Sequence, residues 1–501
     1  MLELPTSQRH KPDILDCLAN LSNDEVFTPP ALANKVLDLL PKEVWSNPTL
    51  RFLDPCCKSG VFLREAAKRL LVGLQHEFSD ESALRDHIFR NMLFGIAITE
   101  LTAQISRRSL YYSKDASSAN SVVTLDSASG NISYVNTRHR YVRGTCSICG
   151  APKQIEGDRV RDHHAYSLIH TGNPFSMKFD VIIGNPPYQL KTNGYGAQAK
   201  PIYHLFVQEA LKLQPRYLSF IIPARWYAGG MGLDEFRKSM LSDRHLRVLV
   251  DHADASECFP GVEIKGGVCY FLWDKHHGNK NEDKCLVKNK VSDTQEIADY
   301  RRLDEYDVLI RSNHALSILR KVMTKDEPRV SSHVSGVQPF GLPTNFRDFK
   351  STKFEGAVEL FARGERGWVA PKVITVNQDW IKRWKVLTSR AYGAGETVPH
   401  QITGKPLVAG PNSACTMTYL VLGVFDHKRQ AECFSAYART RFFRFLVSLR
   451  KNTQDLSRDR FSFVPSLPMT KIWTDETLYD RYGLSTEERD FIASQIKEMP
   501  Q

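Results

Sequence analysis

The 501-residue chain predicts an α/β fold with an open, mostly parallel sheet and helices on both faces. Residues 50–71 and 179–188 each begin as a short apolar strand that runs into a tight turn. An amphipathic helix follows the first of these turns, and strands alternate with helices as far as residue 273. Sheets of this kind bind ligands at the carboxyl ends of their strands, so the two turns mark the expected site.

The first expected helix begins at Thr28-Pro29. Thr28 suits the N-cap and Pro29 the first helical position, so helix capping explains both residues without a ligand. The strand at residues 50–54 ends in the turn Asp54-Pro-Cys-Cys-Lys-Ser-Gly60. A turn of small residues lets a ligand approach the backbone and the N-terminus of the next helix. An ordinary strand-to-helix turn is the alternative interpretation.

Residues 179–188 read Phe-Asp-Val-Ile-Ile-Gly-Asn-Pro-Pro-Tyr and are the most informative segment. Pro186 and Pro187 stiffen the turn and remove two backbone donors, which leaves the Asn185 side-chain oxygen and nearby carbonyls as acceptors. Tyr188 adds a flat aromatic face. This arrangement suits a planar group that bears an NH2, because accepting both amine hydrogens makes the nitrogen more nucleophilic. A strand followed by a proline-rich turn without chemistry is the alternative.

Later segments complete the expected fold. Further strands are expected at residues 94–98, 219–223 and 257–273, the last of these as two strands joined by glycines. From about residue 281 the pattern changes to turns and β-forming residues, so a first domain over 1–280 and a second, α+β domain over 281–501 are expected. Ser485-Thr-Glu-Glu488 is a capping box that opens a last helix.

An insertion at residues 139–172 carries a candidate metal site. Cys146-Ser-Ile-Cys149-Gly is typical of half a zinc knuckle, because the turn directs both thiolates to one point. His164 and His170 are the expected remaining ligands, with His163 in reserve. A redox dithiol, or two cysteines and surface histidines without a common role, are the alternatives. A structural zinc ion here would hold the insertion together and take no part in catalysis.

Composition indicates a packed globular protein with 42% hydrophobic residues. The formal net charge of +11 favours a polyanionic partner. No apolar run is long enough for a membrane span and the start lacks a signal peptide's apolar core, so a cytoplasmic location with reduced cysteines is expected. Residues 439–460 interleave arginines with phenylalanines, which predicts either a helix with a solvated basic face or a phosphate-contacting surface.

Three strings together resemble the N6-adenine DNA methyltransferases, in particular the methylase part of type II or type III-like restriction–modification enzymes. Residues 185–188 match the family's catalytic motif Asn-Pro-Pro-Tyr. Residues 27–30 resemble its N-terminal cofactor motif Phe-Thr-Pro-Pro, and the motif order is the gamma type. The family's AdoMet motif Asp-Pro-x-Cys-Gly-Ser-Gly-x-Phe-Leu is matched by Asp54, Pro55, Cys57, Ser59, Gly60, Phe62 and Leu63.

The resemblance implies S-adenosyl-L-methionine (AdoMet) as cofactor, on a Rossmann-like class I methyltransferase sheet. The residues expected to line the cofactor site are Phe27, Thr28, Pro29, Asp54, Pro55, Cys57, Ser59 and Gly60. Ala97 stands where the family has its ribose-binding acid, so Glu100 either substitutes for that acid or caps the following helix. Asp126 is the expected acid beside the adenine ring of AdoMet. Lys58 replaces a family glycine, so it either points outward or weakens AdoMet binding.

The resemblance also assigns the catalytic roles. Asn185 and the Pro186-Pro187 backbone would accept from the adenine amino group, Tyr188 would stack on the base, and Phe259 would pack alongside. The base would be rotated out of the duplex, because N6 is otherwise paired. The implied function is methylation of adenine N6 in double-stranded DNA within a restriction–modification system.

The domain over 281–501 would then recognise the target sequence. A separate restriction nuclease or helicase subunit is the expected partner, and no membrane partner is expected. Two other interpretations stay open: a methyltransferase acting on RNA or on protein glutamine, whose enzymes share the four-residue motif, and a DNA-binding specificity subunit with an inactive cofactor site, which Lys58 and Ala97 favour.

Overall fold

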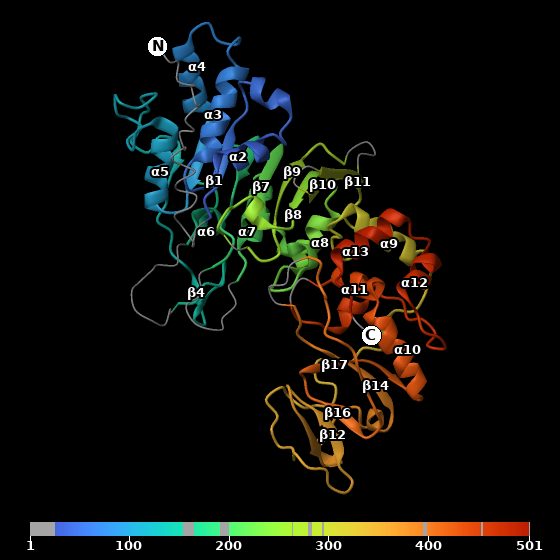
Figure 1. The fold of residues 1–501 in the computed structure, drawn as a ribbon. Coiled ribbons are helices and arrows are strands. Elements are labelled where there is room, and N and C mark those ends of the chain that lie inside the picture. Colours follow the sequence, from blue (N-terminus) through green and yellow to red (C-terminus); the bar gives the residue numbers. More distant parts are fainter. Residues whose placement is uncertain are drawn as a thin grey trace, which may run out of the picture. The chain divides into compact units, whose positions relative to one another are not determined.

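The structure is a computed structural model that describes residues 26–153, 165–190, 200–262, 264–278, 283–292, 295–393, 398–451 and 454–499. The chain divides into two compact units, the first ending at Leu309 and the second beginning at Ile310 (Figure 1). Among the described residues, no helix is long and apolar enough to cross a membrane.

The first unit is built on a nine-stranded sheet in the order β11-β10-β8-β9-β7-β6-β1-β2-β3. Its strands are β1 (Phe52–Cys57), β2 (Leu93–Ala97), β3 (Ile132–Ser133), β6 (Val181–Gly184), β7 (Tyr217–Pro223), β8 (Leu246–His252), β9 (Val268–Asp274), β10 (Cys285–Ser292) and β11 (Gln295–Arg301). Neighbours from β7 through β6, β1 and β2 to β3 are parallel, whereas β9 runs antiparallel between β7 and β8. The expected open, mostly parallel α/β sheet is therefore confirmed.

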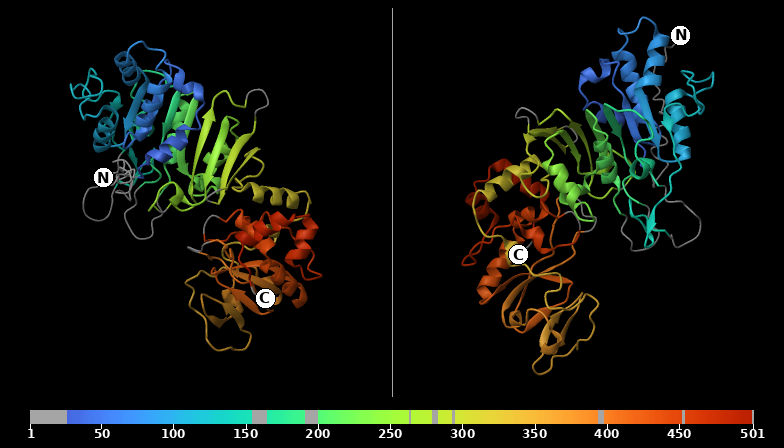
Figure 2. Two further views of the ribbon diagram at one scale, coloured as in Figure 1. Left: turned by 45° about the horizontal axis from the view of Figure 1, so that its top comes forward. Right: turned by 180° about the vertical axis from the view of Figure 1, so that it is seen from behind.

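Helices cover both faces of this sheet (Figure 2). They are α2 (Pro30–Leu37), α3 (Val61–Gly73), α4 (Glu81–His87), α5 (Glu100–Tyr111), α6 (Ser167–Thr171), α7 (Tyr203–Lys212) and α8 (Asp234–Ser242). One core cluster joins α2, α3 and α5 to strand residues such as Phe52 and Val181, and another joins α6, α7 and α8 to their neighbours Leu53 and Ile182. Successive strand residues thus face opposite cores, which explains why these strands read as continuous apolar runs.

Two boundaries differ from those that the sequence predicts. The first unit runs to Leu309 rather than ending at 280, because β10 and β11 extend the same sheet through a parallel pairing of β10 with β8. Residues 257–273 contain one strand rather than two: Ala255–Glu257 is a 3₁₀ turn, and β9 pairs with the preceding strand β8. A polar segment and closely spaced glycines are typical of linkers and hairpins, and local patterns of this kind carry no information on long-range pairing.

The second unit has α+β composition, as expected. Its strands are β12 (Val358–Phe361), β13 (Arg366–Val369), β14 (Trp384–Ser389), β15 (Leu407–Ala409), β16 (Ser413–Cys415) and β17 (Tyr419–Phe425), arranged as the sheets β13-β12-β16 and β15-β14-β17. Its helices are α9 (Asn313–Met323), α10 (Lys428–Arg439), α11 (Arg441–Ser448), α12 (Asp475–Tyr482) and α13 (Thr486–Gln495). The predicted capping box is present, with Ser485 accepting from the Glu488 amide and Glu488 accepting from the Ser485 amide.

Two of the arginines in the stretch at 439–460, Arg444 and Arg450, are buried, whereas Arg458 is exposed. Arg444 is fully buried, and its guanidinium donates to the carbonyls of Arg439, Thr440, Gln401 and Lys497. Arg450 is also buried and lies over the Phe463 ring. The Arg444 guanidinium satisfies backbone acceptors where several segments meet, so this part of the pattern reflects core construction.

Candidate active site

The turns after β1 and β6 meet because these two strands are neighbours in the sheet. Phe52 pairs with Val181 and Leu53 with Ile182, so both strands end at the same edge. Gly184, the last residue of β6, allows this approach: a Cβ atom there would lie 2.9 Å from Oδ1 of Asp54 and 3.0 Å from Sγ of Cys56. The sequence prediction that these two motifs share one site is consistent with this geometry.

Asn185 is buried and held in one orientation. Its Nδ2 donates to Oγ1 of Thr28 at 3.0 Å and to the carbonyl of Val26 at 3.2 Å. Both donors therefore point to the N-terminal segment, and no group in the described part of the chain donates to the buried Oδ1. A buried amide oxygen without a donor is costly, which suggests that this acceptor serves a ligand.

The first helix begins one residue later than the sequence predicts, so Thr28 precedes the N-cap and Pro29 is the N-cap itself. The helix α2 begins at Pro30, its N-cap is Pro29, and no side chain among the described residues caps it. The buried Thr28 hydroxyl instead accepts from Asn185, and Phe27 is half-buried. A hydroxyl one residue before the N-cap can bond elsewhere in the fold. Helix signals alone could not reveal this partner, which is 157 residues away.

Two aromatic rings lie next to the asparagine. Tyr188 has a half-buried ring and meets the ring of buried Phe259 edge-on, with centroids 6.3 Å apart. The Tyr188 hydroxyl is itself buried, and this burial raises its pKa well above the ordinary value. It lies beside the Asn185 side chain without a hydrogen bond of standard geometry between them. Pro186 and Pro187 are buried beneath, so the turn is rigid.

Lys58 points into the site. Its side chain is buried, Nζ donates to the Val26 carbonyl at 3.0 Å, and Nζ lies 5.9 Å from the centroid of the Tyr188 ring. The Val26 carbonyl therefore accepts from both Lys58 and Asn185. Lys58 therefore does not point outward, and weaker AdoMet binding stays a prediction.

The turn at residues 54–60 offers charge and backbone donors to a ligand. Gly60, with φ +74°, is the N-cap of the 13-residue helix α3, and within the described part of the chain no side chain caps that helix. Its first-turn amides are thus available to an anionic or polar group. Pro55, Cys57 and Ser59 are all buried in this turn. These features fit the carboxylate and polar groups of AdoMet, with α3 as the element that would hold them.

Asp54 is a buried carboxyl in the same turn. Its Oδ1 accepts from the Cys56 amide at 3.1 Å. Burial raises the pKa of Asp54 from 3.8 to about 6, against the opposing effects of the Cys56 and Cys57 hydrogen bonds and the charge on Lys58. At neutral pH the group is an ionised carboxylate in an apolar setting, which suits a cationic ligand such as a sulfonium.

We expect Asp54 to make stability depend on pH. Because its folded pKa lies above 3.8, the folded state binds the proton more tightly than the unfolded state. Its contribution is therefore present at acid pH and is lost as the pH rises through about 6, by on the order of 3 kcal/mol. Urea unfolding across this range should show the loss in the wild type and not in Asp54→Asn. The fully exposed Asp126→Asn is the control, and an unchanged profile in Asp54→Asn would contradict the assignment.

The two other predicted acids lie in different places. Glu100 is exposed in the first turn of α5, just beyond the carboxyl end of β2, and Thr99 rather than Glu100 caps that helix. Asp126 pairs with Arg90 at 3.4 Å, and Arg90 precedes β2. Asp126 therefore lies at the amino-terminal edge of the strands, and the structure does not bring this predicted cofactor acid to the turn at 54–60. The 20 residues between α5 and β3 carry no sequence pattern that shows at which edge of the sheet Asp126 lies.

Four metal-ligating side chains come together in the insertion between β3 and β6. They are His139, Cys146, Cys149 and His170, whose ligand atoms all lie within 4.8 Å of one another. Cys146, Cys149 and His170 belong to the predicted set. His164 and its reserve His163 lie outside the described residues. His139 was not predicted because it precedes the Cys-x-x-Cys turn by seven residues, whereas the histidines expected as ligands follow that turn.

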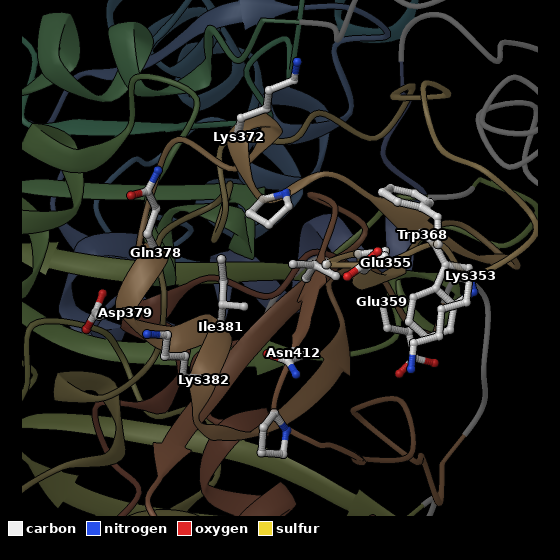
Figure 3. A pocket seen from close by; sticks show the side chains of 16 residues that line it. Lys353, Glu355, Glu359, Trp368, Lys372, Gln378, Asp379, Ile381, Lys382 and Asn412 are labelled. Atoms are coloured by element: carbon white, nitrogen blue, oxygen red, sulfur yellow. The ribbon is translucent and has the colours of Figure 1, made fainter.

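The second unit contains a cavity of about 1050 Å³ that is distant in sequence from all of these motifs. Figure 3 shows its mixed lining, in which Lys353 lies over the Trp368 ring while Glu355 and Glu359 add negative charge. Lys372, Gln378 and Asp379 lie on another wall. Opposite charges are interspersed in this lining, and none of the motifs predicted from the sequence contributes to it.

Comparison with known proteins agrees with the site. Residues 91–259 match the family described as Eco57I restriction-modification methylase. A relative from Mycoplasma pneumoniae (strain ATCC 29342 / M129 / Subtype 1), described as an uncharacterized adenine-specific methylase, is 37% identical over 323 residues, which are 58% of this chain and 75% of the relative. The chain therefore belongs to the adenine-specific methylase family and carries an Eco57I-type restriction–modification methylase domain.

Several solved structures are similar at a lower level. A nuclease-deletion mutant of the type ISP restriction–modification enzyme LlaGI, in complex with a DNA substrate mimic, has a TM-score of 0.48 and 11% identity, with 86% of this chain and 45% of that chain covered. The type IIL enzyme MmeI, in complex with DNA, has a TM-score of 0.43 and 13% identity, with 90% of this chain and 65% of that chain covered. The M protein of the type I enzyme EcoKI (EC 2.1.1.72) has a TM-score of 0.35 and 14% identity, with 55% of this chain and 49% of that chain covered. The chain spans about half to two thirds of these proteins.

Proposed function

We propose that this protein transfers a methyl group from AdoMet to N6 of adenine in double-stranded DNA, as the modification component of a restriction–modification system. The orientation of Asn185 carries the proposal. Both of its amide hydrogens are used by Val26 and Thr28, so its buried oxygen is left as an acceptor beside an aromatic platform. An adenine amino group is planar, donates two hydrogens and is attached to a ring that can stack.

The residues of the site act by positioning and polarisation. Asn185 Oδ1 and the Pro186 carbonyl would accept the two N6 hydrogens, which frees the nitrogen lone pair for attack. Tyr188 would stack on the base, and Phe259 fixes the Tyr188 ring by its edge-on contact. Holding the amine in place accounts for most of the rate enhancement expected. The Pro-Pro turn limits movement of both acceptors.

The cofactor would be held by the turn at 54–60 and the N-terminal segment. When bound, AdoMet would supply a methyl group from its sulfonium. N6 would take the methyl group, the sulfur would keep the electron pair of the broken bond, and the amine would lose a proton to solvent. Asp54 would balance the positive charge, and the uncapped N-terminus of α3 would bind the carboxylate. Glu100 would meet the ribose from the end of β2, and Phe27 would line the methionine end.

The second unit would recognise the target sequence, and a separate nuclease or helicase subunit would carry out restriction. These two assignments follow the family resemblance. Arg444 and Arg450 are buried, so DNA contacts in that unit would come from other side chains.

The test is transfer from AdoMet labelled in its methyl group to DNA, RNA and protein extracts, followed by digestion and identification of the methylated product. We expect label in DNA, as N6-methyldeoxyadenosine. Label in RNA or in protein glutamine would show that this molecule, and not DNA, is the substrate. Binding of DNA without transfer to any acceptor would support a specificity subunit instead.

A further inference from the structure

The cluster formed by His139, Cys146, Cys149 and His170 draws its members from three segments. Cys146 ends the short hairpin of β4 (Tyr141–Val142) and β5 (Thr145–Cys146), Cys149 follows in the next turn, and His170 lies in α6. Cys146, Cys149 and His170 are buried, with exposed fractions of 3%, 1% and 9%. Side chains from separate segments that converge in the interior suggest one common ligand.

The distances within the cluster match those around a tetrahedral metal ion. Sγ of Cys146 lies 3.6 Å from Nε2 of His170, and Sγ of Cys149 lies 3.5 Å from Nδ1 of His139. Zinc bonds of about 2.3 Å to sulfur and about 2.1 Å to nitrogen, opened to a tetrahedral angle, place the two ligand atoms about 3.6 Å apart. The cysteine and histidine pairs are therefore already at ligand spacing.

The surroundings orient two of the ligands, His170 and Cys146, for metal binding. Nδ1 of His170 lies 2.9 Å from the carbonyl of Tyr166, so that nitrogen carries the proton and Nε2 is left to face the thiols. The amides of Ile148 and Cys149 hydrogen-bond to the sulfur of Cys146. Gly150, with φ +76°, closes the turn by donating its amide to the Cys146 carbonyl at 2.9 Å. This is the arrangement of a knuckle rather than of two unrelated thiols.

The cluster packs on the segment that leaves the catalytic turn. Cys146 and Cys149 share a core with Leu190 and Ile202. The amide of Ile202 donates to the Tyr188 carbonyl at 3.1 Å, and that of Leu190 donates to the Lys200 carbonyl at 2.9 Å. The Lys200 side chain lies against Gly150. A rigid insertion here would support the backbone on which Tyr188 stands.

We propose that His139, Cys146, Cys149 and His170 bind one zinc ion, which holds these ligands against residues 188–190 and 200–202. Four ligands close the coordination sphere, so the ion leaves no position for substrate and is structural. The ligand set is Cys2His2, with His139 rather than His164 as the fourth member.

The experiment measures metal in the full-length protein purified under reducing conditions without added metal. We expect one zinc per chain. Replacement by cobalt(II) should give the charge-transfer and visible absorption bands of a tetrahedral site with two thiolates. Hydrogen exchange compared before and after chelation should rise at the amides of Leu190 and Ile202, whereas the amides of α3 should be unchanged. Absence of zinc, with no cobalt spectrum, would overturn the proposal.

The matched pair His139→Ala and His164→Ala distinguishes the ligand sets. We expect His139→Ala to lose the bound metal and the cobalt spectrum and His164→Ala to retain both. Loss in His164→Ala alone would overturn the structural ligand set. His139→Cys keeps a ligand at this position and should retain the metal, which separates coordination from a general folding defect. A disulfide between Cys146 and Cys149 under these conditions, with no metal, would instead support the redox interpretation.

Discussion

Replacing Asn185 by alanine is expected to lower methyl transfer by at least about 100-fold, because it removes the acceptor that polarises the amine in the transition state. AdoMet binding should change little, since the cofactor turn lies on the neighbouring strand. Single-turnover transfer to DNA and a direct binding titration with AdoMet measure the two quantities separately. A loss confined to transfer identifies a group that acts on the target base.

The matched control for this substitution is Asn289→Ala. Asn289 is also a buried asparagine whose Oδ1 accepts no hydrogen bond within the described residues, and it lies in β10 of the same sheet. Its loss removes similar volume and polarity away from the catalytic turn, so transfer should persist. If the Asn185→Ala protein retained wild-type transfer, or if the control lost as much, the proposed role of Asn185 would be wrong.

Replacing Lys58 by glycine is expected to tighten AdoMet binding by about tenfold or more. The Lys58 ammonium is buried between the Val26 carbonyl and the Tyr188 ring, so it places a positive charge inside the site. A second positive charge within about 8 Å costs about 2 kcal/mol at an effective dielectric constant of 20. Glycine at this position also removes the side chain that the cofactor must displace. Calorimetry with AdoMet and with its uncharged thioether product measures the effect.

The comparison of these two ligands separates charge from space. If charge repulsion dominates, Lys58→Gly should raise the affinity for AdoMet more than the affinity for the thioether. Lys58→Met should then give most of the same increase in affinity for AdoMet. If volume dominates, both ligands should gain equally and Lys58→Met should gain little. Weaker AdoMet binding in Lys58→Gly would show that the lysine helps to build the cofactor site, because it also ties the turn to Val26.

Much of the first unit could be predicted because local patterns determine it. Strands buried on both faces read as apolar runs, and a contiguous motif such as residues 185–188 keeps its geometry wherever the sheet places it. Residues that depend on distant partners could not be predicted. Thr28 bonds to Asn185 instead of capping a helix, and Asp126 lies at the wrong edge of the sheet.

The arginines and the metal cluster show the same limit. An alternation of arginine and phenylalanine predicts a helix with two faces, but it cannot show that the carbonyls of Gln401 and Lys497, from two other segments, accept from an inward-pointing Arg444. The Cys-x-x-Cys turn was evident from its spacing. His139 lies outside any regular pattern, and only the folded insertion brings it to the thiols.

The carbonyl of Val26 accepts from both Asn185 and Lys58, and this has a thermodynamic consequence. A cofactor that displaces Lys58 leaves the Val26 carbonyl to Asn185 alone. Binding at the cofactor site therefore changes how strongly Asn185 is held in the orientation that accepts the base. Such linkage is reciprocal: cofactor should raise affinity for the flipped base by the same factor as the base raises affinity for cofactor. The two substrates would then bind with positive heterotropic cooperativity.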